Sequence, residues 1–71
     1  MTTLRLHREL YARHAVDEAI RVFAPHATLE RRDDASHWTV QITAATPERE
    51  RRVAGELGNY ALGLTVQERR R

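Results

Sequence analysis

Alternating apolar and polar residues mark short strands along the chain. In residues 3–10, Leu4 and Leu6 alternate with polar neighbours, which is the pattern of a strand with one buried face. Residues 37–44 alternate more strongly, with β-branched and aromatic side chains on one face: Trp38, Val40, Ile42 and Ala44. Residues 27–32 form a shorter strand of mixed polarity, and the Asp-Asp-Ala-Ser run after it is typical of a turn. The last two strands therefore form a hairpin.

Two segments in which apolar residues recur every three or four positions predict amphipathic helices. The first covers about residues 13–24 and ends before Pro25, whose ring cannot comfortably continue a helix; no N-cap is visible at its start. The second begins at Thr46-Pro47-Glu48, which supplies an N-cap, a first-turn proline and an acid at the positive helix end. Its apolar stripe contains Val53, Leu57, Tyr60, Ala61 and Leu64.

The end of the second helix has two interpretations. Glycines in a helix interior each cost about 0.8–1 kcal/mol relative to alanine, and this helix contains Gly55, Gly58 and Gly63. Gly63 as a C-terminal cap would leave residues 64–67 as a short fourth strand, which the β-branched Thr65-Val66 pair favours. In the other interpretation the helix continues into Glu68.

The order β-α-β-β-α predicts an α+β fold, a two-layer sandwich with the split β-α-β arrangement of half a ferredoxin-like domain. Residues 1–71 form a single small domain. The third strand takes the middle of the sheet, and the first strand keeps an unpaired edge if no fourth strand follows. The predicted core consists of Leu4, Leu6, Val16, Ile20, Phe23, Leu29, Trp38, Val40, Ile42, Val53, Leu57 and Leu64.

Several helical residues in this layout resemble one protein family. Tyr11 opens the first helix, Phe23 closes it, and the second helix contains the run Leu57-Gly58-Asn59-Tyr60-Ala61-Leu62-Gly63. The chain resembles the HxsD family of the bacterial His-Xaa-Ser systems, whose run is similar to Leu-Leu-Asn-Asp-Tyr-x-Leu-Arg-Glu; Gly63 stands here in place of the arginine. Members are small proteins found beside radical S-adenosylmethionine (SAM) enzymes that are thought to modify peptides. The resemblance favours a continuous helix beyond Gly63.

Composition limits the classes of function that fit. The chain has no cysteine, so any thiolate or iron–sulfur chemistry belongs to another protein. All 12 basic residues are arginine, and 10 acids, mostly interleaved with them, leave a net charge of +2. Interleaved charges and a predicted open sheet face without base-stacking aromatic residues argue against nucleic-acid binding. No segment is apolar enough for a signal peptide or a membrane span, so we expect a cytoplasmic protein.

No catalytic or metal-binding set is evident in the sequence. The histidines occur singly rather than at repeated ligand spacing, and the two that the alternation places on the open sheet face are His7 and His37. Ser36 lies in a turn without the setting of a nucleophile elbow. The glycines are spread along a helix rather than gathered in a phosphate-binding loop. We therefore predict neither an enzyme nor a bound cofactor.

These observations predict a non-catalytic accessory subunit whose role is binding. A core this small gains from sharing a surface, so we expect a homodimer or a hetero-complex with a protein or peptide partner. The resemblance implies that the partner is a radical SAM enzyme or its precursor peptide in a peptide-maturation system. The candidate partner-binding residues are Arg5, His7, Asn59 and Tyr60. The alternative is a small regulatory or nucleic-acid-associated α/β domain that uses the arginines.

Overall fold

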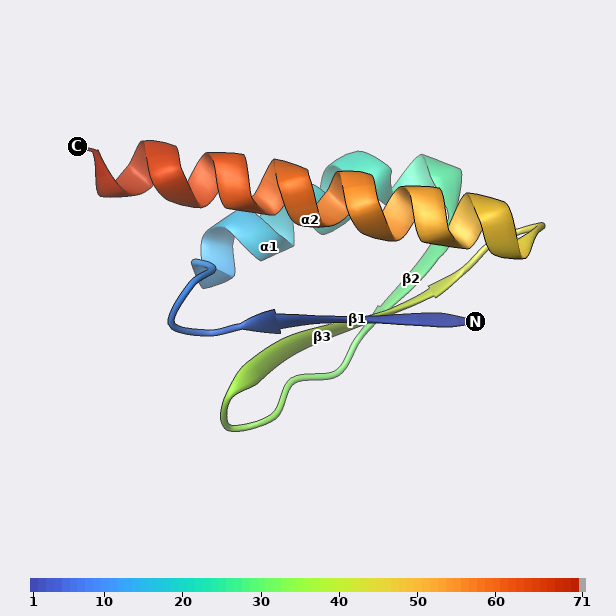
Figure 1. Cartoon of the computed structure of the whole chain (residues 1–71), viewed down its shortest axis with the longest axis horizontal. Coiled ribbons are helices and arrows are strands. Elements are labelled where there is room, and N and C mark those ends of the chain that lie inside the picture. The colour runs from blue at the N-terminus through green and yellow to red at the C-terminus, as the bar shows by residue number, and fades with distance from the viewer. Residues whose placement is uncertain (71) are drawn as a thin grey trace.

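The predicted order β-α-β-β-α is confirmed by a computed structural model, which describes residues 1–70. Figure 1 shows the elements along the chain: β1 (Thr2–His7), α1 (Arg13–Phe23), the short 3-10 helix η1 (Ala24–His26), β2 (Thr28–Arg31), β3 (His37–Thr43) and α2 (Pro47–Arg69). None of the helices in residues 1–70 is long and apolar enough to cross a membrane.

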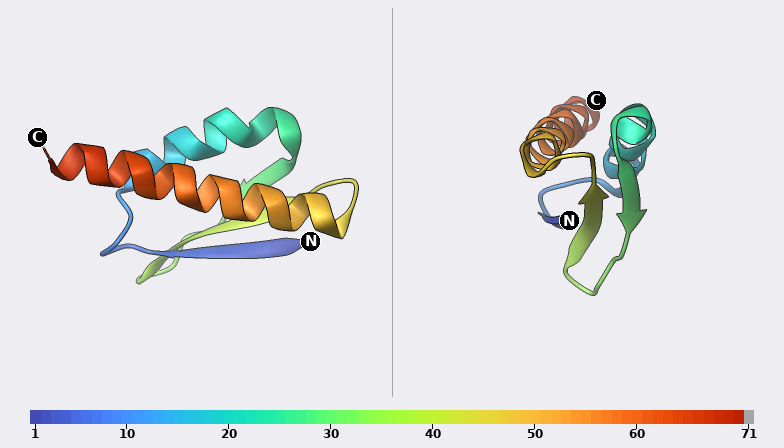
Figure 2. Two further views of the ribbon diagram at one scale, coloured as in Figure 1. Left: turned by 45° about the horizontal axis from the view of Figure 1, so that its top comes forward. Right: turned by 90° about the vertical axis from the view of Figure 1, so that its right-hand side faces the viewer.

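The three strands form one antiparallel sheet in the order β1-β3-β2, with β3 in the middle as predicted. The register places Trp38 of β3 beside Leu6 of β1, and Ile42 of β3 beside Leu29 of β2. Both helices lie on the same side of the sheet, α2 over β1 and α1 over β2 (Figure 2). No element within residues 1–70 covers the opposite face, and β1 and β2 are the edge strands.

β1 is shorter than the strand predicted over residues 3–10. The chain turns after His7, whose C=O accepts hydrogen bonds from the N–H groups of Leu10 and Tyr11, each 3.0 Å long. Leu10 continues the alternation of the strand but lies in this turn with 59% of its surface exposed. The predicted boundary was wrong because an alternating pattern alone does not distinguish a strand residue from an exposed apolar residue in the following turn.

α2 continues without interruption for 23 residues, so the interpretation with a fourth strand is wrong and the continuous helix is confirmed. Gly63 does not end the helix, and no glycine in residues 1–70 has a positive φ. Thr65 is only 1% exposed; its hydroxyl donates to the C=O of Ala61 (2.8 Å) and accepts from the N–H of Ala12 (3.0 Å). These two bonds satisfy the hydroxyl of a buried threonine, and the bond from Ala12 joins α2 to the start of α1. Arg71 lies outside the described residues.

α1 begins without a side-chain cap of its own. Ala12 is the N-cap residue, with extended backbone angles and no side chain able to accept a hydrogen bond. Instead, the N–H of Ala12 is bonded to Thr65, and the indole Nε1 of Trp38 donates to the C=O of Tyr11 (2.9 Å). Tertiary contacts thus fix the start of this helix, which explains why the local sequence has no start signal.

The core lies between the sheet and the helices, largely as predicted. Its buried members are Leu6, Val16, Ala19, Val40, Ile42, Val53, Leu57 and Ala61. Five of the predicted residues lie at the rim with partial exposure: Leu4, Ile20, Phe23, Leu29 and Trp38. Leu64 is partly exposed and lies outside the cluster, so its assignment to the core was wrong. The next residue, Thr65, is buried instead, because it continues the row of buried residues four apart, Val53, Leu57 and Ala61, and its hydroxyl is satisfied by hydrogen bonds.

Shortening Leu57 should destabilise the domain strongly, because this side chain is fully buried. Leu57→Ala removes packed atoms and leaves a cavity, so we expect a loss of about 2–5 kcal/mol in the free energy of unfolding. Leu62→Ala, on the same helix at a residue that is 42% exposed, is the matched control and should change stability by about 0.5 kcal/mol or less. Urea unfolding followed by circular dichroism measures both values. Similar losses in the two variants would contradict the assigned core.

Two glycines of α2 should be replaceable at a gain in stability. A Cβ atom at Gly55 or Gly63 would meet no neighbouring atom within 4 Å. Gly55→Ala and Gly63→Ala should each raise the free energy of unfolding by about 0.8–1 kcal/mol, because alanine has the higher helix propensity. The same urea titration checks this, and a decrease in either variant would show that the glycine serves the folded domain in another way.

Candidate functional site

The outer edge of β1 has no hydrogen-bonding partner in residues 1–70. The N–H of Arg8 donates to the C=O of Ser36 (3.0 Å), in register with the β1–β3 ladder. In an antiparallel ladder the hydrogen-bonded pairs recur at every second residue, so the even-numbered residues of β1 bond to β3. The outward-facing N–H groups therefore belong to Thr3, Arg5 and His7. We call this row of groups, together with the C=O groups of Thr3 and Arg5, the free edge.

Polar contacts fix the chain at both ends of β1. At its start, Glu50 of α2 is only 6% exposed and accepts hydrogen bonds from the Thr2 hydroxyl (3.0 Å) and the Ala44 N–H (3.1 Å). The hydrogen bond from the Ala44 N–H is the main cause that holds the pKa of Glu50 below its ordinary value of 4.5. After its end, Arg69 Nη2 donates to the C=O of Glu9 (2.8 Å). The free edge is thus held between two attachments to α2.

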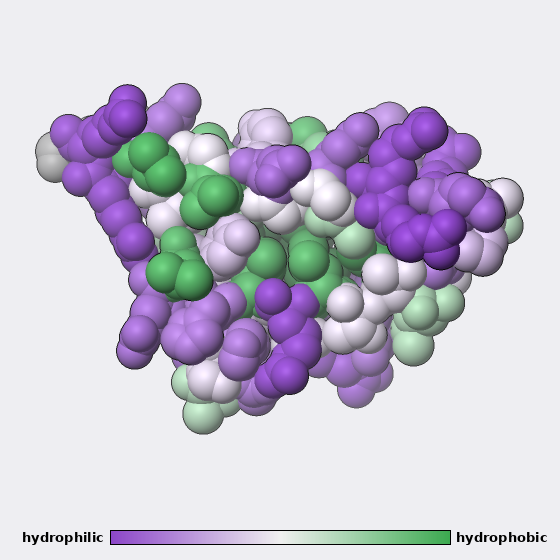
Figure 3. All heavy atoms as spheres, in the orientation of Figure 1, coloured by the Kyte–Doolittle hydropathy of each residue, from purple (hydrophilic) through white to green (hydrophobic). Residues whose placement is uncertain are grey.

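An apolar seam borders the free edge on the side of α2. Gly58 faces β1, since a Cβ atom there would lie 4.0 Å from Cδ2 of Leu4, so no side chain at this position of the helix covers the leucine. Leu62, one turn further along α2, is 42% exposed, as is Val66, and Leu10 is 59% exposed. Figure 3 shows apolar groups at the surface between the helix and the strand and over the C-terminal half of the helix. We use the name apolar seam for these four residues of β1, the turn after it and α2: Leu4, Leu10, Leu62 and Val66.

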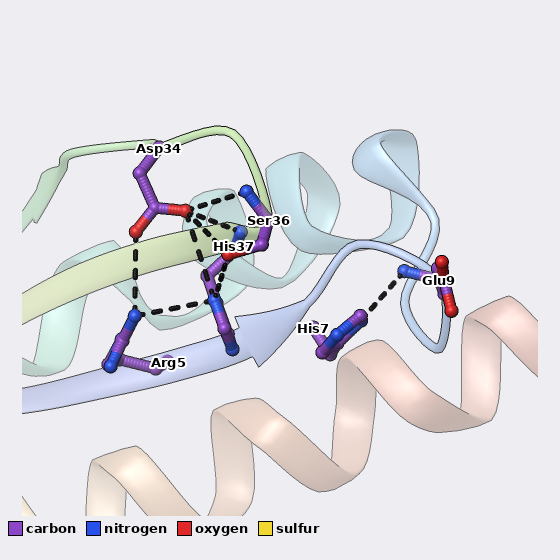
Figure 4. A network of polar contacts seen from close by, with 6 residues as sticks. All are labelled: Arg5, His7, Glu9, Asp34, Ser36 and His37. Carbon is purple, nitrogen blue, oxygen red and sulfur yellow. Dashed lines mark hydrogen bonds and ion pairs between the residues drawn. The ribbon is translucent and has the colours of Figure 1, made fainter.

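On the open face of the sheet, the side chain of Arg5 reaches the turn between β2 and β3 (Figure 4). Asp34 Oδ1 accepts hydrogen bonds from the N–H groups of Ser36 (2.8 Å) and His37 (2.7 Å), which lower the pKa of Asp34 to about 2. Arg5 Nη2 lies 3.5 Å from Asp34 Oδ2 and 3.3 Å from His37 Nδ1. The Arg5 side chain is nevertheless 59% exposed, so its guanidinium group remains accessible from the solvent.

Ser36, His37 and Asp34 are not arranged as a catalytic triad. The Ser36 hydroxyl lies 2.8 Å from Nδ1 of His37, and Asp34 Oδ1 lies 3.8 Å from the same nitrogen. In a triad the nucleophile and the acid lie on opposite nitrogens of the imidazole ring. Here the carboxylate bonds the backbone of the turn, so the three residues shape the hairpin.

His7 and His37 share the open face of the sheet, as the alternation predicts. They are register partners on β1 and β3, and their rings meet edge to face with centroids 5.0 Å apart. Nδ1 of His7 accepts a hydrogen bond from the N–H of Glu9 (3.2 Å). Within residues 1–70, no group of three or more His, Cys, Asp or Glu side chains is placed to hold a metal ion.

The four candidate partner-binding residues fall on two separate surfaces. Arg5 and His7 lie together on the open face of β1. Tyr60 lies on the side of α2 toward α1, where its ring packs edge to face against Phe23 with centroids 6.0 Å apart. Asn59 is exposed on α2. The structure therefore does not join the strand residues and the helix residues into one site.

The apolar seam was not among the predicted sites. Leu62 and Val66 are four residues apart and hence on the same side of the helix, but that side is not the core stripe. This spacing is the one signal in the sequence that points to a second apolar surface. Leu10 was assigned to a strand, which concealed its position in the turn.

A groove of about 520 Å³ lies between the end of α1 and the start of α2, away from the free edge. Its lining contains charges of both signs, from Arg49 and Arg52 and from Glu48 and Glu56. Because neither sign predominates, the groove does not indicate the charge of a ligand, and we therefore consider the edge of β1 the better candidate site.

The chain matches no family model, and neither a curated protein nor a solved structure is significantly similar to it. The resemblance to HxsD proteins therefore stays a prediction, and the functional inference starts from the geometry of β1 and its surroundings.

Acid should weaken the fold partly through Asp34. A carboxyl group whose pKa is lowered in the folded state stabilises the fold above its ordinary pKa of 3.8, and this contribution is lost as the pH falls toward about 2. Asp34→Asn keeps an oxygen acceptor for the turn but does not titrate, so its stability should fall less steeply over this range. Urea unfolding at a series of pH values measures both slopes. Parallel curves for the variant and the wild type would contradict the proposed role of the charged carboxylate.

Proposed function

We propose that this protein is a non-catalytic binding subunit that takes up an extended segment of a partner along the free edge of β1. The observation that carries the proposal is the row of outward N–H groups at Thr3, Arg5 and His7, which is ready to form main-chain hydrogen bonds. Strand addition to such an edge is a common mode of peptide recognition, in which the main chain supplies affinity and the side chains supply specificity.

The composition of the edge supports this proposal. Edge strands that must stay unpaired are commonly short or protected by proline, bulges or a covering loop. β1 is six residues long, contains no proline and is held at both ends by α2. Its only fully charged side chain is Arg5. An edge with this little protection is suited to pairing.

A protein or peptide partner fits the open sheet face better than a nucleic acid does. By the register, the open face of β3 carries His37, Thr39, Gln41 and Thr43, without Phe, Tyr or Trp. Sheets that bind single-stranded nucleic acid place such aromatic residues on their central strands to stack the bases. The resemblance to HxsD proteins leads us to propose that the partner is a peptide-modifying radical SAM enzyme or its precursor peptide, bound in a hetero-complex in the cytoplasm.

The backbone of Arg5 provides the test. Arg5→Pro removes the outward N–H at the middle of the free edge, and proline is tolerated at sheet edges. We expect it to weaken binding of a radical SAM enzyme or precursor peptide from a His-Xaa-Ser system by about tenfold or more, as measured by biolayer interferometry. Arg5→Gln, which keeps the N–H, is the control and should retain main-chain pairing. Melting curves establish that both variants are folded.

Two results would contradict the proposal. Equal binding by Arg5→Pro and the wild type would show that the partner does not pair with β1. Failure of the wild type to bind either candidate partner at concentrations of roughly tens of micromolar would remove the accessory role itself.

A further inference from the structure

We infer that the segment pairing with β1 alternates acidic and apolar residues, with its acidic side chains beside Arg5 and its apolar side chains beside the apolar seam. This inference rests on the proposed strand addition and specifies the chemistry of the partner. It follows from the two different environments on either side of the free edge, because successive side chains of an added strand point to opposite faces of the sheet.

On the open face, Arg5 provides the charge that the partner must match. A residue directly opposite Arg5 on an added strand would place its Cβ roughly 4.5–5.5 Å from that of Arg5, within reach of the guanidinium. The contacts of Arg5 with Asp34 and His37 both use Nη2, so in residues 1–70 Nε and Nη1 make no hydrogen bond. A carboxylate is the group that a guanidinium binds in a two-pronged geometry.

The contact with Asp34 leaves most of the hydrogen-bonding capacity of the Arg5 guanidinium unused. Its Oδ1 is committed to the turn, where it accepts from the N–H groups of Ser36 and His37 and from the Ser36 hydroxyl. Its Oδ2 reaches Arg5 only at 3.5 Å, between two half-exposed side chains. A partner carboxylate can therefore bind Arg5 without displacing the bonds that hold the hairpin.

On the side of α2, the apolar seam favours apolar side chains at the alternate positions of the added strand. A side chain of the added strand that points toward α2 would lie beside Leu4, which is partly exposed and faces Gly58 rather than a larger side chain. Further along, it would meet Leu62, which is 42% exposed. Apolar side chains at these positions would cover surface that water now reaches (Figure 3), and burial of apolar surface is favourable.

A second copy of the chain fits this edge less well. Two β1 strands that pair across a two-fold axis over the whole free edge, Thr3 to His7, would place Arg5 directly opposite Arg5 of the copy. Like charges directly opposite one another destabilise a strand pair. The charge of Arg5 therefore favours a partner with carboxylates over self-association.

Three labelled hexapeptides test the inference by fluorescence polarisation. They alternate valine with glutamate, glutamine or lysine, so each can fit the edge in either strand direction. The Glu-Val peptide should bind the wild type about tenfold more tightly than the Lys-Val peptide, with Gln-Val between them. Arg5→Glu should reverse this order. Leu62→Asp, at an exposed position, should weaken all three, and Arg5→Pro should abolish binding.

Each other outcome overturns the inference in a recognisable way. Equal affinities for the three peptides, all lost in Arg5→Pro, would retain strand addition but refute the acidic preference. Binding that survives Arg5→Pro would place the peptides elsewhere and refute the inference. Dimerisation of the chain alone that Arg5→Pro prevents would make a second copy the occupant. If no peptide binds, the inference fails, and the enzyme and precursor binding experiment with Arg5→Pro decides the proposed function separately.

Discussion

The fold depends on α2 remaining helical through Thr65, whose hydroxyl is buried against the start of α1. This hydroxyl donates to the C=O of Ala61 within its own helix and accepts from the N–H of Ala12, so it joins the two helices. Residues 64–67, whose β-branched pair favours a strand, are therefore part of a helix that runs on to Arg69. Had residues 64–67 formed a strand instead, they would have been available to pair with β1, and the free edge would not exist.

The arrangement of elements could be predicted from periodicity, whereas the details that build the site could not. The alternation at Leu4 and Leu6 and at Trp38, Val40 and Ile42 identified the two longest strands, and Pro25 marked the end of the first helix. Leu64 and Thr65 show the limit of this reasoning. A helical stripe defines its centre well but its borders poorly, and the burial of a polar threonine depends on hydrogen-bond partners that the stripe does not reveal.

Some features of the candidate site can likewise be predicted from the sequence, and others cannot. That Arg5 and His7 share a polar face follows from the two-residue period of any strand. Which backbone groups face outward depends on the pairing register, which became known only from the bond between Arg8 and Ser36. Glu50 illustrates the same point, because an acidic residue in the first turn of a helix is ordinarily exposed, and its burial depends on partners at Thr2 and Ala44.

The attachments on either side of β1 also bear on the entropy of recognition. A disordered segment that becomes a strand on binding loses backbone freedom worth about 1–2 kcal/mol per residue. β1 has lost that freedom already, during folding, because it is paired with β3 along its length, with Glu50 attached at its start and Arg69 at the loop beyond its end. Any ordering that accompanies complex formation therefore falls on the incoming segment alone, and a partner that is itself stiff in the extended conformation would have the thermodynamic advantage.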